Sequence, residues 1–358
     1  MNYFGVIMAG GGGTRFWPLS REKKPKQLLN LSGKGVMVNE AIERLRTVVE
    51  RDCVFIVTSD SQATEMKNAT RGKLPEENIL VEPSARNTAA CIGYAAMEIV
   101  KKYGDGVMII TPADQYVEDV SSLSEAFHKA ACVAENDDKL VTIGLKPSFP
   151  SSGFGYIKYD VESEESVRTV IEFREKPDVE TAQTYIDSGQ YAWNSGMFIW
   201  KASCILEKLQ EYVPDIYSDL SKIGEAMNTA QEQSVLNEIY PQIRKISIDY
   251  AVMEPSAIRG EVMVVPCECG WHDLGSWDMM DVLHKPDENG NILVGDVFAV
   301  NSKQSVIYST SRTVTAVDVD NLVIVETPDA IMICPKDKAQ DVKKIVDLLK
   351  ETGRKELL

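Results

Sequence analysis

The sequence has 358 residues, of which 44% are hydrophobic, and its formal net charge is −16. This length predicts one large domain with a smaller one, and the composition is that of a globular chain with its own hydrophobic core. No apolar run approaches the roughly 18 residues of a transmembrane helix and no signal segment is recognisable, so we expect a cytoplasmic protein without a membrane partner. The acidic charge argues against a nucleic-acid partner.

Cysteine and histidine are sparse and scattered along the chain. The seven cysteines are odd in number, and the three histidines show no metal-ligand spacing. Cys267 and Cys269 form a single Cys-x-Cys without a second pair, so a zinc site is not expected. Free thiols in a reducing compartment are the expected state.

The first part of the chain alternates between apolar runs and amphipathic stretches. Asn87 has the residue type of a helix N-cap, and Gly104 that of a helix stop. Apolar strands separated by helices are typical of a parallel sheet covered on both faces, and ligands of such sheets bind beyond the carboxyl ends of the strands. We expect strands at 3–8, 53–59, 78–83, 106–114 and 139–145, and helices at 37–51, 87–104 and 121–136.

The second part predicts further strands at 153–160, 167–177, 191–200 and 262–269, with helices from about 179 and between 200 and about 240. A stretch rich in turn-forming residues, HKPDENGN (284–291), predicts a boundary between a domain at 1–286 and one at 287–358. Beyond it follow short β-rich runs, beginning with ILVGDVFAV (292–300), and a closing helix. The expected fold class is α/β: a Rossmann-like, doubly wound, mostly parallel sheet with a small C-terminal β domain of β-helix-like character.

A basic, glycine-rich loop follows the first expected strand, within MAGGGGTRFWPLSREKKPKQ (8–27). It is not a P-loop, because Arg15 and Phe16 stand where that motif needs Lys and Ser or Thr. It is not a dinucleotide fingerprint either, because Arg15 replaces the last glycine. Glycines still allow backbone N–H groups to approach a phosphate, and Arg15 and Lys26 add positive charge. The loop therefore predicts a phosphate site.

The same loop resembles a known signature. Gly11-x-Gly13-Thr14-Arg15-Phe16-x-Pro18-Leu19 with Pro25-Lys26-Gln27 is similar to that of the sugar-1-phosphate nucleotidyltransferases. More narrowly, the chain resembles the mannose-1-phosphate guanylyltransferases, which implies the reaction of GTP with mannose 1-phosphate to give GDP-mannose and diphosphate. Seven further segments agree in order: EPSARNTAA (82–90), TPADQ (111–115), GFGYIKY (153–159), FREKP (173–177), WNSGMF (193–198), SIDYAVME (247–254) and GWHDLGSW (270–277).

The resemblance also implies roles for individual residues. Asp114 and Asp273 are the implied Mg²⁺ ligands, and carboxylates from separate strand ends suit an ion that accepts one or two carboxylates together with phosphates. The implied catalytic residues are Arg15, Lys26, Asp114 and Lys176. The implied nucleotide contacts are Ala9, Gly10, Gly11, Gly12, Gly13, Thr14, Glu82, Arg86, Asn87 and Thr88. The implied sugar-phosphate contacts are Gly155, Glu175, Lys176, Asn194 and Asp249.

Other readings stay open at this point. The chain could take another nucleotide or sugar, or be a non-catalytic nucleotide-sugar-binding regulator, while the failed fingerprint argues against a dinucleotide-dependent oxidoreductase. Gln115 stands where the family commonly has histidine, and Gly12 where it often has serine. Whether Arg21 and Lys24 touch phosphate is open, and Lys23 is expected in solvent. A homodimer is expected by analogy, and phosphomannose isomerase activity is not expected, because the cupin-like domain of longer members is absent.

Overall fold

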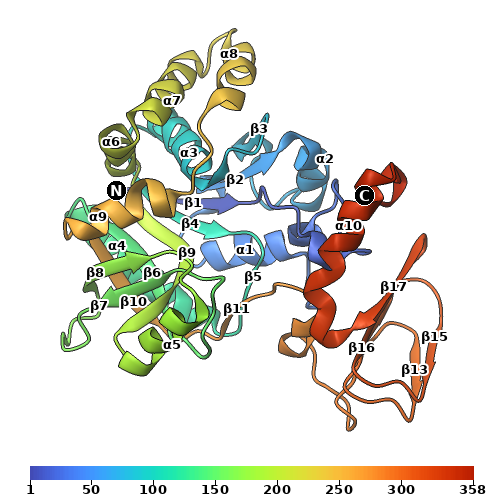
Figure 1. Ribbon diagram of the computed structural model, residues 1–358. Coiled ribbons are helices and arrows are strands. Elements are labelled where there is room, and N and C mark those ends of the chain that lie inside the picture. Colours follow the sequence, from blue (N-terminus) through green and yellow to red (C-terminus); the bar gives the residue numbers. More distant parts are fainter.

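The computed structural model describes residues 1–358. A nine-stranded sheet of order β3-β2-β1-β4-β9-β6-β10-β8-β7 forms the centre of its larger part (Figure 1). The pairs from β3 to β4, and the pair β6–β10, are parallel. β9 runs antiparallel to β4 and β6, and β7 and β8 pair antiparallel. The strands are β1 (Tyr3–Met8), β2 (Val54–Ser59), β3 (Ile79–Glu82), β4 (Val107–Pro112), β6 (Leu140–Leu145), β7 (Tyr156–Tyr159), β8 (Arg168–Arg174), β9 (Tyr191–Lys201) and β10 (Val262–Cys267).

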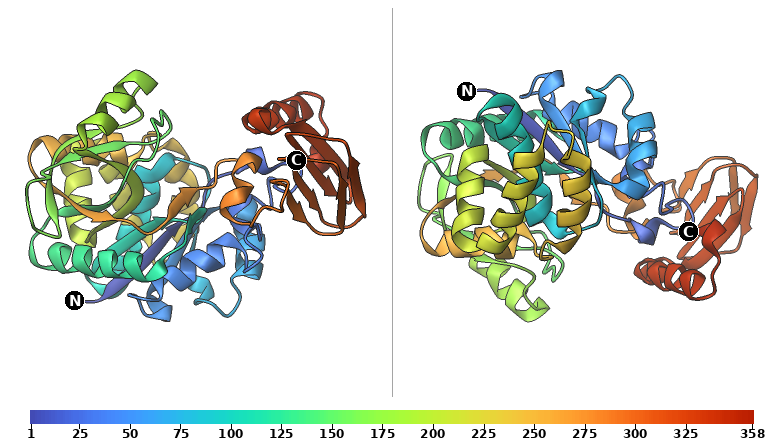
Figure 2. Two further views of the ribbon diagram at one scale, coloured as in Figure 1. Left: turned by 90° about the horizontal axis from the view of Figure 1, so that it is seen from below. Right: turned by 90° about the horizontal axis from the view of Figure 1, so that it is seen from above.

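Helices cover both faces of this sheet, as the apolar strands predict (Figure 2). On β2, Phe55 and Val57 belong to one hydrophobic cluster, whereas Val54 and Ile56 belong to another. Alternate side chains of a strand point to opposite faces, so each cluster is the core of one face. The first face is covered by α3 (Asn87–Tyr103), α6 (Ala202–Tyr212), α7 (Pro214–Ala226), α8 (Glu232–Ile239) and α9 (Glu254–Ile258). The second is covered by α1 (Met37–Leu45), α2 (Asp60–Ala69), α4 (Val120–Asn136) and α5 (Val179–Ser188).

The C-terminal strands stack in the β-helix-like manner expected from the sequence. β12, β14 and β16 pair in parallel, β13 and β15 form a second parallel pair, and β17 closes the first sheet antiparallel to β16. Gly295 divides the run 292–300 into two strands, because its φ of +92° turns the chain and a Cβ there would lie 2.1 Å from the Ser309 carbonyl oxygen. The elements are β12 (Ile292–Val294), β13 (Val297–Val300), β14 (Val306–Ser309), β15 (Val314–Val317), β16 (Leu322–Thr327), β17 (Ala330–Pro335) and α10 (Val342–Glu351).

The two parts share a third hydrophobic cluster, in which Phe16 and Trp17 of the glycine-rich loop pack with Trp277, Val342 and Val346. In Figure 1, α10 accordingly lies beside the first, blue segment of the chain. β11 (Trp271–Asp273) pairs with β5 (Gln115–Val117) before the chain passes to β12. The division at 286/287 falls between these elements and stays a prediction.

No helix has both the length and the apolarity that crossing a membrane requires. All seven cysteines are free, and Cys91, Cys204, Cys267 and Cys269 are buried.

Candidate active site

The glycine-rich loop is held close to the segment that carries Lys26. Gly13 has a φ of +56°, and a Cβ at this position would lie 2.3 Å from Cβ of Lys26. Only glycine permits both the left-handed conformation and this approach. Beneath the loop, Nε2 of Gln27 donates to the carbonyl oxygens of Ala9 at 2.8 Å and Gly11 at 2.9 Å. The carbonyls are thereby turned inward, which is the arrangement that leaves loop N–H groups for a ligand.

Lys26 lies between the two predicted metal ligands. Its Nζ is 3.1 Å from Oδ2 of Asp114 and 3.5 Å from Oδ1 of Asp273, and its side chain is only 5% exposed. The β5–β11 ladder explains the convergence, because it places Asp273 opposite Gln115, the neighbour of Asp114. Burial raises the pKa of Asp273, and Lys26 opposes this shift. Two carboxylates and one ammonium therefore meet at the carboxyl edge of the sheet.

The remaining basic residues of the loop face different surroundings. Arg15 is exposed, and its Nη1 donates to Oε1 of Gln340 in the C-terminal domain at 2.7 Å. Arg21 donates to the Leu357 carbonyl oxygen and pairs with Asp329, so its guanidinium is bound to the C-terminal domain. The side chains of Lys23 and Lys24 are exposed and make no hydrogen bond. Arg15 and Lys26 thus remain the two cations of the loop predicted to bind phosphate.

The segment 82–88 carries the predicted nucleotide contacts. Glu82 is buried and accepts a hydrogen bond from the Tyr240 hydroxyl, and its other oxygen faces Gly10. Nε of Arg86 donates to Oγ of Ser84 at 3.3 Å. The expected N-cap at Asn87 is wrong: α3 starts at Asn87 itself after Arg86, and Oδ1 of Asn87 accepts from the adjacent N–H of Thr88. Asn87 has a φ of +68°, which removes it from the extended conformation of an N-cap.

Four of the five predicted sugar-phosphate residues form a contiguous cradle. Asn194 donates from its backbone to the Gly155 carbonyl at 2.8 Å and from Nδ2 to Oδ1 of Asp249 at 2.9 Å. A Cβ on Gly155 would lie 2.4 Å from Oε2 of Glu175, so any larger residue here would displace that carboxylate. β7 explains the convergence, because Tyr156 pairs with residues of both β8 and β9 next to Glu175 and Asn194.

Lys176 stands at the edge of this cradle. Its Nζ is 2.7 Å from Oε1 of Glu175, and its side chain is 57% exposed. Burial lowers the pKa of Lys176, but the hydrogen bond and charge of Glu175 outweigh it, and the net pKa is raised. Burial and the neighbouring charge of Glu175 raise the pKa of Asp249 to about 6. The cradle thus combines acceptors suited to sugar hydroxyls with a cation suited to a phosphate.

Comparison with known proteins identifies the family of this chain. A family described as "Nucleotidyl transferase" matches residues 4–288. The chain belongs to the nucleotidyl transferase family. A second family, described as "MannoseP isomerase/GMP-like beta-helix domain", matches residues 295–349.

Several relatives of this nucleotidyl transferase carry informative names. This chain is 39% identical to a mannose-1-phosphate guanylyltransferase of Salmonella muenchen, over 98% of this chain and 74% of the relative. It is 37% identical to the xanthan biosynthesis protein XanB of Xanthomonas campestris, with the same coverage. A crystal structure described as mannose-1-phosphate geranyltransferase from Thermus thermophilus superimposes with a TM-score of 0.85 at 29% identity, covering 98% of this chain and all of that one.

The sequence did not point to Gln62, which supports the glycine-rich loop of this nucleotidyl transferase from beneath, nor to the partner of Gln115. Gln62 accepts from Nε2 of Gln27 at 3.1 Å and donates to the Gly11 carbonyl. Gln115 is buried, and its Nε2 donates to the Ser195 carbonyl oxygen at 2.6 Å, which fixes β5 against β9. Buried amides that bond backbone carbonyls leave no local sequence pattern, so only the packing identifies them.

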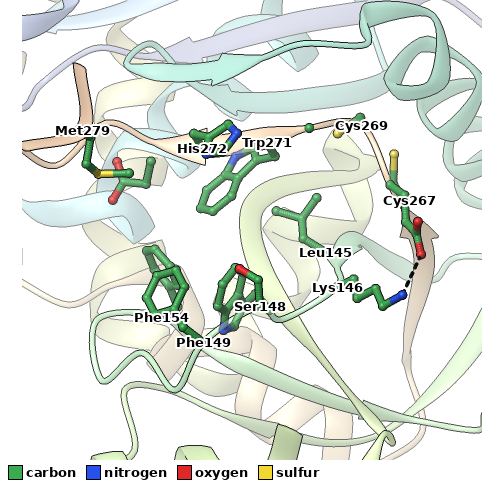
Figure 3. A pocket seen from close by; sticks show the side chains of 14 residues that line it. Leu145, Lys146, Ser148, Phe149, Phe154, Cys267, Cys269, Trp271, His272 and Met279 are labelled. Carbon is green, nitrogen blue, oxygen red and sulfur yellow. Dashed lines mark ion pairs between the residues drawn. The ribbon is translucent and has the colours of Figure 1, made fainter. Parts of the chain in front are cut away.

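A separate hollow of about 260 Å³ opens beside Asp273 (Figure 3). Its lining includes four large aromatic side chains: Phe149, Phe154, Trp193 and Trp271. Lys146 and Glu268 form an exposed ion pair of 3.6 Å there, drawn dashed in Figure 3. Trp193 precedes Asn194 on β9, so the two side chains lie on opposite faces of the sheet. Among the predicted site residues only Asp273 lines this hollow, which is therefore distinct from the sugar cradle.

The buried carboxyl of Glu82 predicts a pH-dependent stability of the nucleotidyl transferase. Burial raises the pKa of Glu82 from 4.5 to about 7, against the effect of the Tyr240 hydrogen bond. Because the pKa is higher in the folded protein, protonated Glu82 stabilises the fold. This stabilisation is complete below the unfolded-state pKa and is lost as the pH rises through about 7. Glu82→Gln removes this dependence while keeping an acceptor for Tyr240. We expect the wild type to lose on the order of 2 kcal/mol relative to the variant between pH 5 and 8.

Urea unfolding of both proteins at several pH values measures this difference. Glu77→Gln is the matched control, because Glu77 is exposed and makes no side-chain hydrogen bond. A wild-type-to-variant difference in free energy of unfolding that stays constant from pH 5 to 8 contradicts the role given to Glu82.

Proposed function

We propose that the chain is a mannose-1-phosphate guanylyltransferase, which converts GTP and α-D-mannose 1-phosphate into GDP-mannose and diphosphate. The main support for this proposal is that hydrogen bonds join the predicted nucleotide and metal residues to the sugar cradle at one edge of the sheet. Gln115 bonds the Ser195 carbonyl, next to Asn194 of the sugar cradle. Oγ1 of Thr88 accepts from the N–H of Ile248, next to Asp249, at 2.8 Å. The names of relatives at 37–39% identity support the choice of GTP and mannose 1-phosphate.

In the proposed mechanism the nucleophile is a phosphate oxygen of mannose 1-phosphate. This oxygen is already ionised near neutral pH, so no general base is needed. It attacks the α-phosphorus of GTP in line. The bond from that phosphorus to the oxygen bridging to the β-phosphate breaks, and diphosphate leaves with the bonding electron pair.

The site residues have separate tasks in bringing the anionic mannose 1-phosphate toward the triphosphate of GTP. Gly10 to Thr14 offer backbone N–H groups to the triphosphate, whereas the N–H of the predicted contact Ala9 already donates to the Val57 carbonyl oxygen at 2.8 Å. Arg15 and Lys26 offset the charge on the leaving diphosphate. Lys176 binds the phosphate of the sugar, and Glu175, Asn194 and Asp249 bind its hydroxyls. The segment from Glu82 to Thr88 binds the base and ribose.

The donor set fits Mg²⁺. Asp114 and Asp273 converge on one position with hard oxygen donors, and no third carboxylate, histidine or cysteine joins them. This matches an ion that takes one or two carboxylates and completes its shell with phosphate and water oxygens. Asp114 and Asp273 would hold the ion, and when bound it supplies positive charge that offsets the charge of the phosphates.

A substrate panel tests this assignment. Diphosphate release is measured with GTP, ATP, UTP and dTTP against mannose 1-phosphate and glucose 1-phosphate. The pair GTP and mannose 1-phosphate is expected to give the highest kcat/KM. A higher value for another pair contradicts the proposed substrates, and nucleotide-sugar binding without turnover on any pair favours the regulator. We further propose a cytoplasmic homodimer without a nucleic-acid or membrane partner, which light scattering and fractionation test.

A further inference from the structure

The C-terminal domain meets the phosphate-binding loop directly. Trp17 of the loop donates from Nε1 to the Leu357 carbonyl oxygen at 2.8 Å, and Phe16 shares a hydrophobic cluster with Val342. The short 3₁₀ helix Lys336–Asp341, which precedes α10, lies at this contact. A side chain from this helix is therefore able to reach the residues assigned to phosphate binding.

Gln340 makes that contact through both ends of its amide. Its Oε1 accepts from Nη1 of Arg15 at 2.7 Å, and its Nε2 donates to Oγ of Ser276 at 2.6 Å. Ser276 is fully buried and donates onward to Asp278. The partners fix the orientation of the amide, because a guanidinium has only donors and the serine hydrogen is already given to Asp278.

This bridge joins the two loops that carry the proposed phosphate and metal residues. Ser276 is three residues beyond Asp273, and Arg15 is on the glycine-rich loop. Gly275 lies beneath the bridge, where a Cβ would be 3.5 Å from Nη1 of Arg15 and 3.7 Å from Nε2 of Gln340. The guanidinium makes no other hydrogen bond, so its remaining N–H groups are left for phosphate oxygens.

We propose that Gln340 is a positioning residue, supplied by the C-terminal domain, which holds Arg15 in the orientation that binds the triphosphate. The proposal rests on the proposed function of the site. A long exposed arginine loses side-chain entropy when a ligand immobilises it, and an anchor already in place removes part of that cost. The small domain thus contributes to turnover and not only to folding.

The test compares Gln340→Leu and Gln340→Ala with the wild type. Leucine is similar in size but makes neither hydrogen bond. We expect kcat/KM for GTP to fall roughly tenfold, the size of effect typical of losing a hydrogen bond to a charged group. KM for mannose 1-phosphate and the thermal unfolding midpoint are expected to stay unchanged. Lys343→Ala is the matched control, since Lys343 is exposed on the adjoining helix and makes no hydrogen bond or ion pair.

A double variant separates positioning from a merely structural role. If Gln340 acts through Arg15, Gln340→Leu costs nothing further in an Arg15→Ala background. Additive losses, or equal changes in KM for both substrates, overturn the proposal. Unchanged kinetics in both Gln340 variants, with an active wild type, overturn it as well. An inactive wild type instead contradicts the proposed function itself, so the two failures are distinguishable.

Discussion

Asp114→Asn is expected to lower kcat by about 10²- to 10³-fold while leaving the fold intact. Asparagine has nearly the same shape and keeps an oxygen that can accept from Lys26, which lies 3.1 Å away. It removes the negative charge, and with it one of only two carboxylates at the proposed Mg²⁺ position. Since Asp114 is 40% exposed, little folding energy depends on that charge. Steady-state diphosphate release and a thermal melt measure the two effects.

Asp137→Asn provides the comparison for this variant, because Asp137 is exposed beyond α4 and its side chain makes no hydrogen bond. We expect wild-type turnover from it. Near-full turnover in Asp114→Asn shows that the carboxylate has no part in the reaction. A variant that has lost both turnover and its cooperative melt contradicts the view that Asp114 serves function more than stability.

Lys26→Met is expected to reduce turnover by at least about 10²-fold and also to destabilise the ion-free protein. Lys26 is buried between Asp114 and Asp273, so its removal takes away the nearest counter-ion of two facing carboxylates. Breaking a buried ion pair costs up to about 3–5 kcal/mol, and the partial exposure of both carboxylates reduces this to about 1–2 kcal/mol. Added Mg²⁺ should therefore raise the melting midpoint of the variant more than that of the wild type.

Lys23→Met is the matched control, since Lys23 lies in the same loop but is exposed and makes no hydrogen bond. It is expected to keep wild-type turnover and the wild-type response to Mg²⁺. Equal stabilisation of Lys26→Met and wild type by Mg²⁺ argues against a shared position for the lysine and the metal. Retained turnover in Lys26→Met removes Lys26 from the proposed mechanism.

The sequence predicts much of the central sheet because strands such as β1 and β4 are apolar on both faces. Each is followed by a distinctive segment, the glycine-rich loop after β1 and Asp114 after β4. The motif segments name the residues of the sugar cradle, and the structure brings Gly155, Glu175, Asn194 and Asp249 into contact. Local patterns cannot supply the antiparallel insertion of β9 between β4 and β6, because strand order depends on long-range pairing.

The bonds that support the site were beyond prediction for the same reason. Gln62 and Gln340 are ordinary glutamines in the sequence, and each acquires its role from partners far away along the chain. The pairing of Asp273 with Gln115 depends on a three-residue strand, which is too short for a periodic signal. The sequence also cannot distinguish the two arginines of the loop. Arg21 uses its guanidinium to bind the C-terminal domain, whereas Arg15 makes one hydrogen bond and keeps free N–H donors.

The most direct test of guanylyltransferase activity is diphosphate release from GTP and mannose 1-phosphate, measured with Mg²⁺ and with the ion removed by chelation. GDP-mannose and diphosphate are expected in equal amounts with Mg²⁺, and chelation is expected to abolish a turnover that added Mg²⁺ restores. Absence of diphosphate release from GTP with any sugar phosphate, in a folded protein with Mg²⁺ present, would contradict this activity.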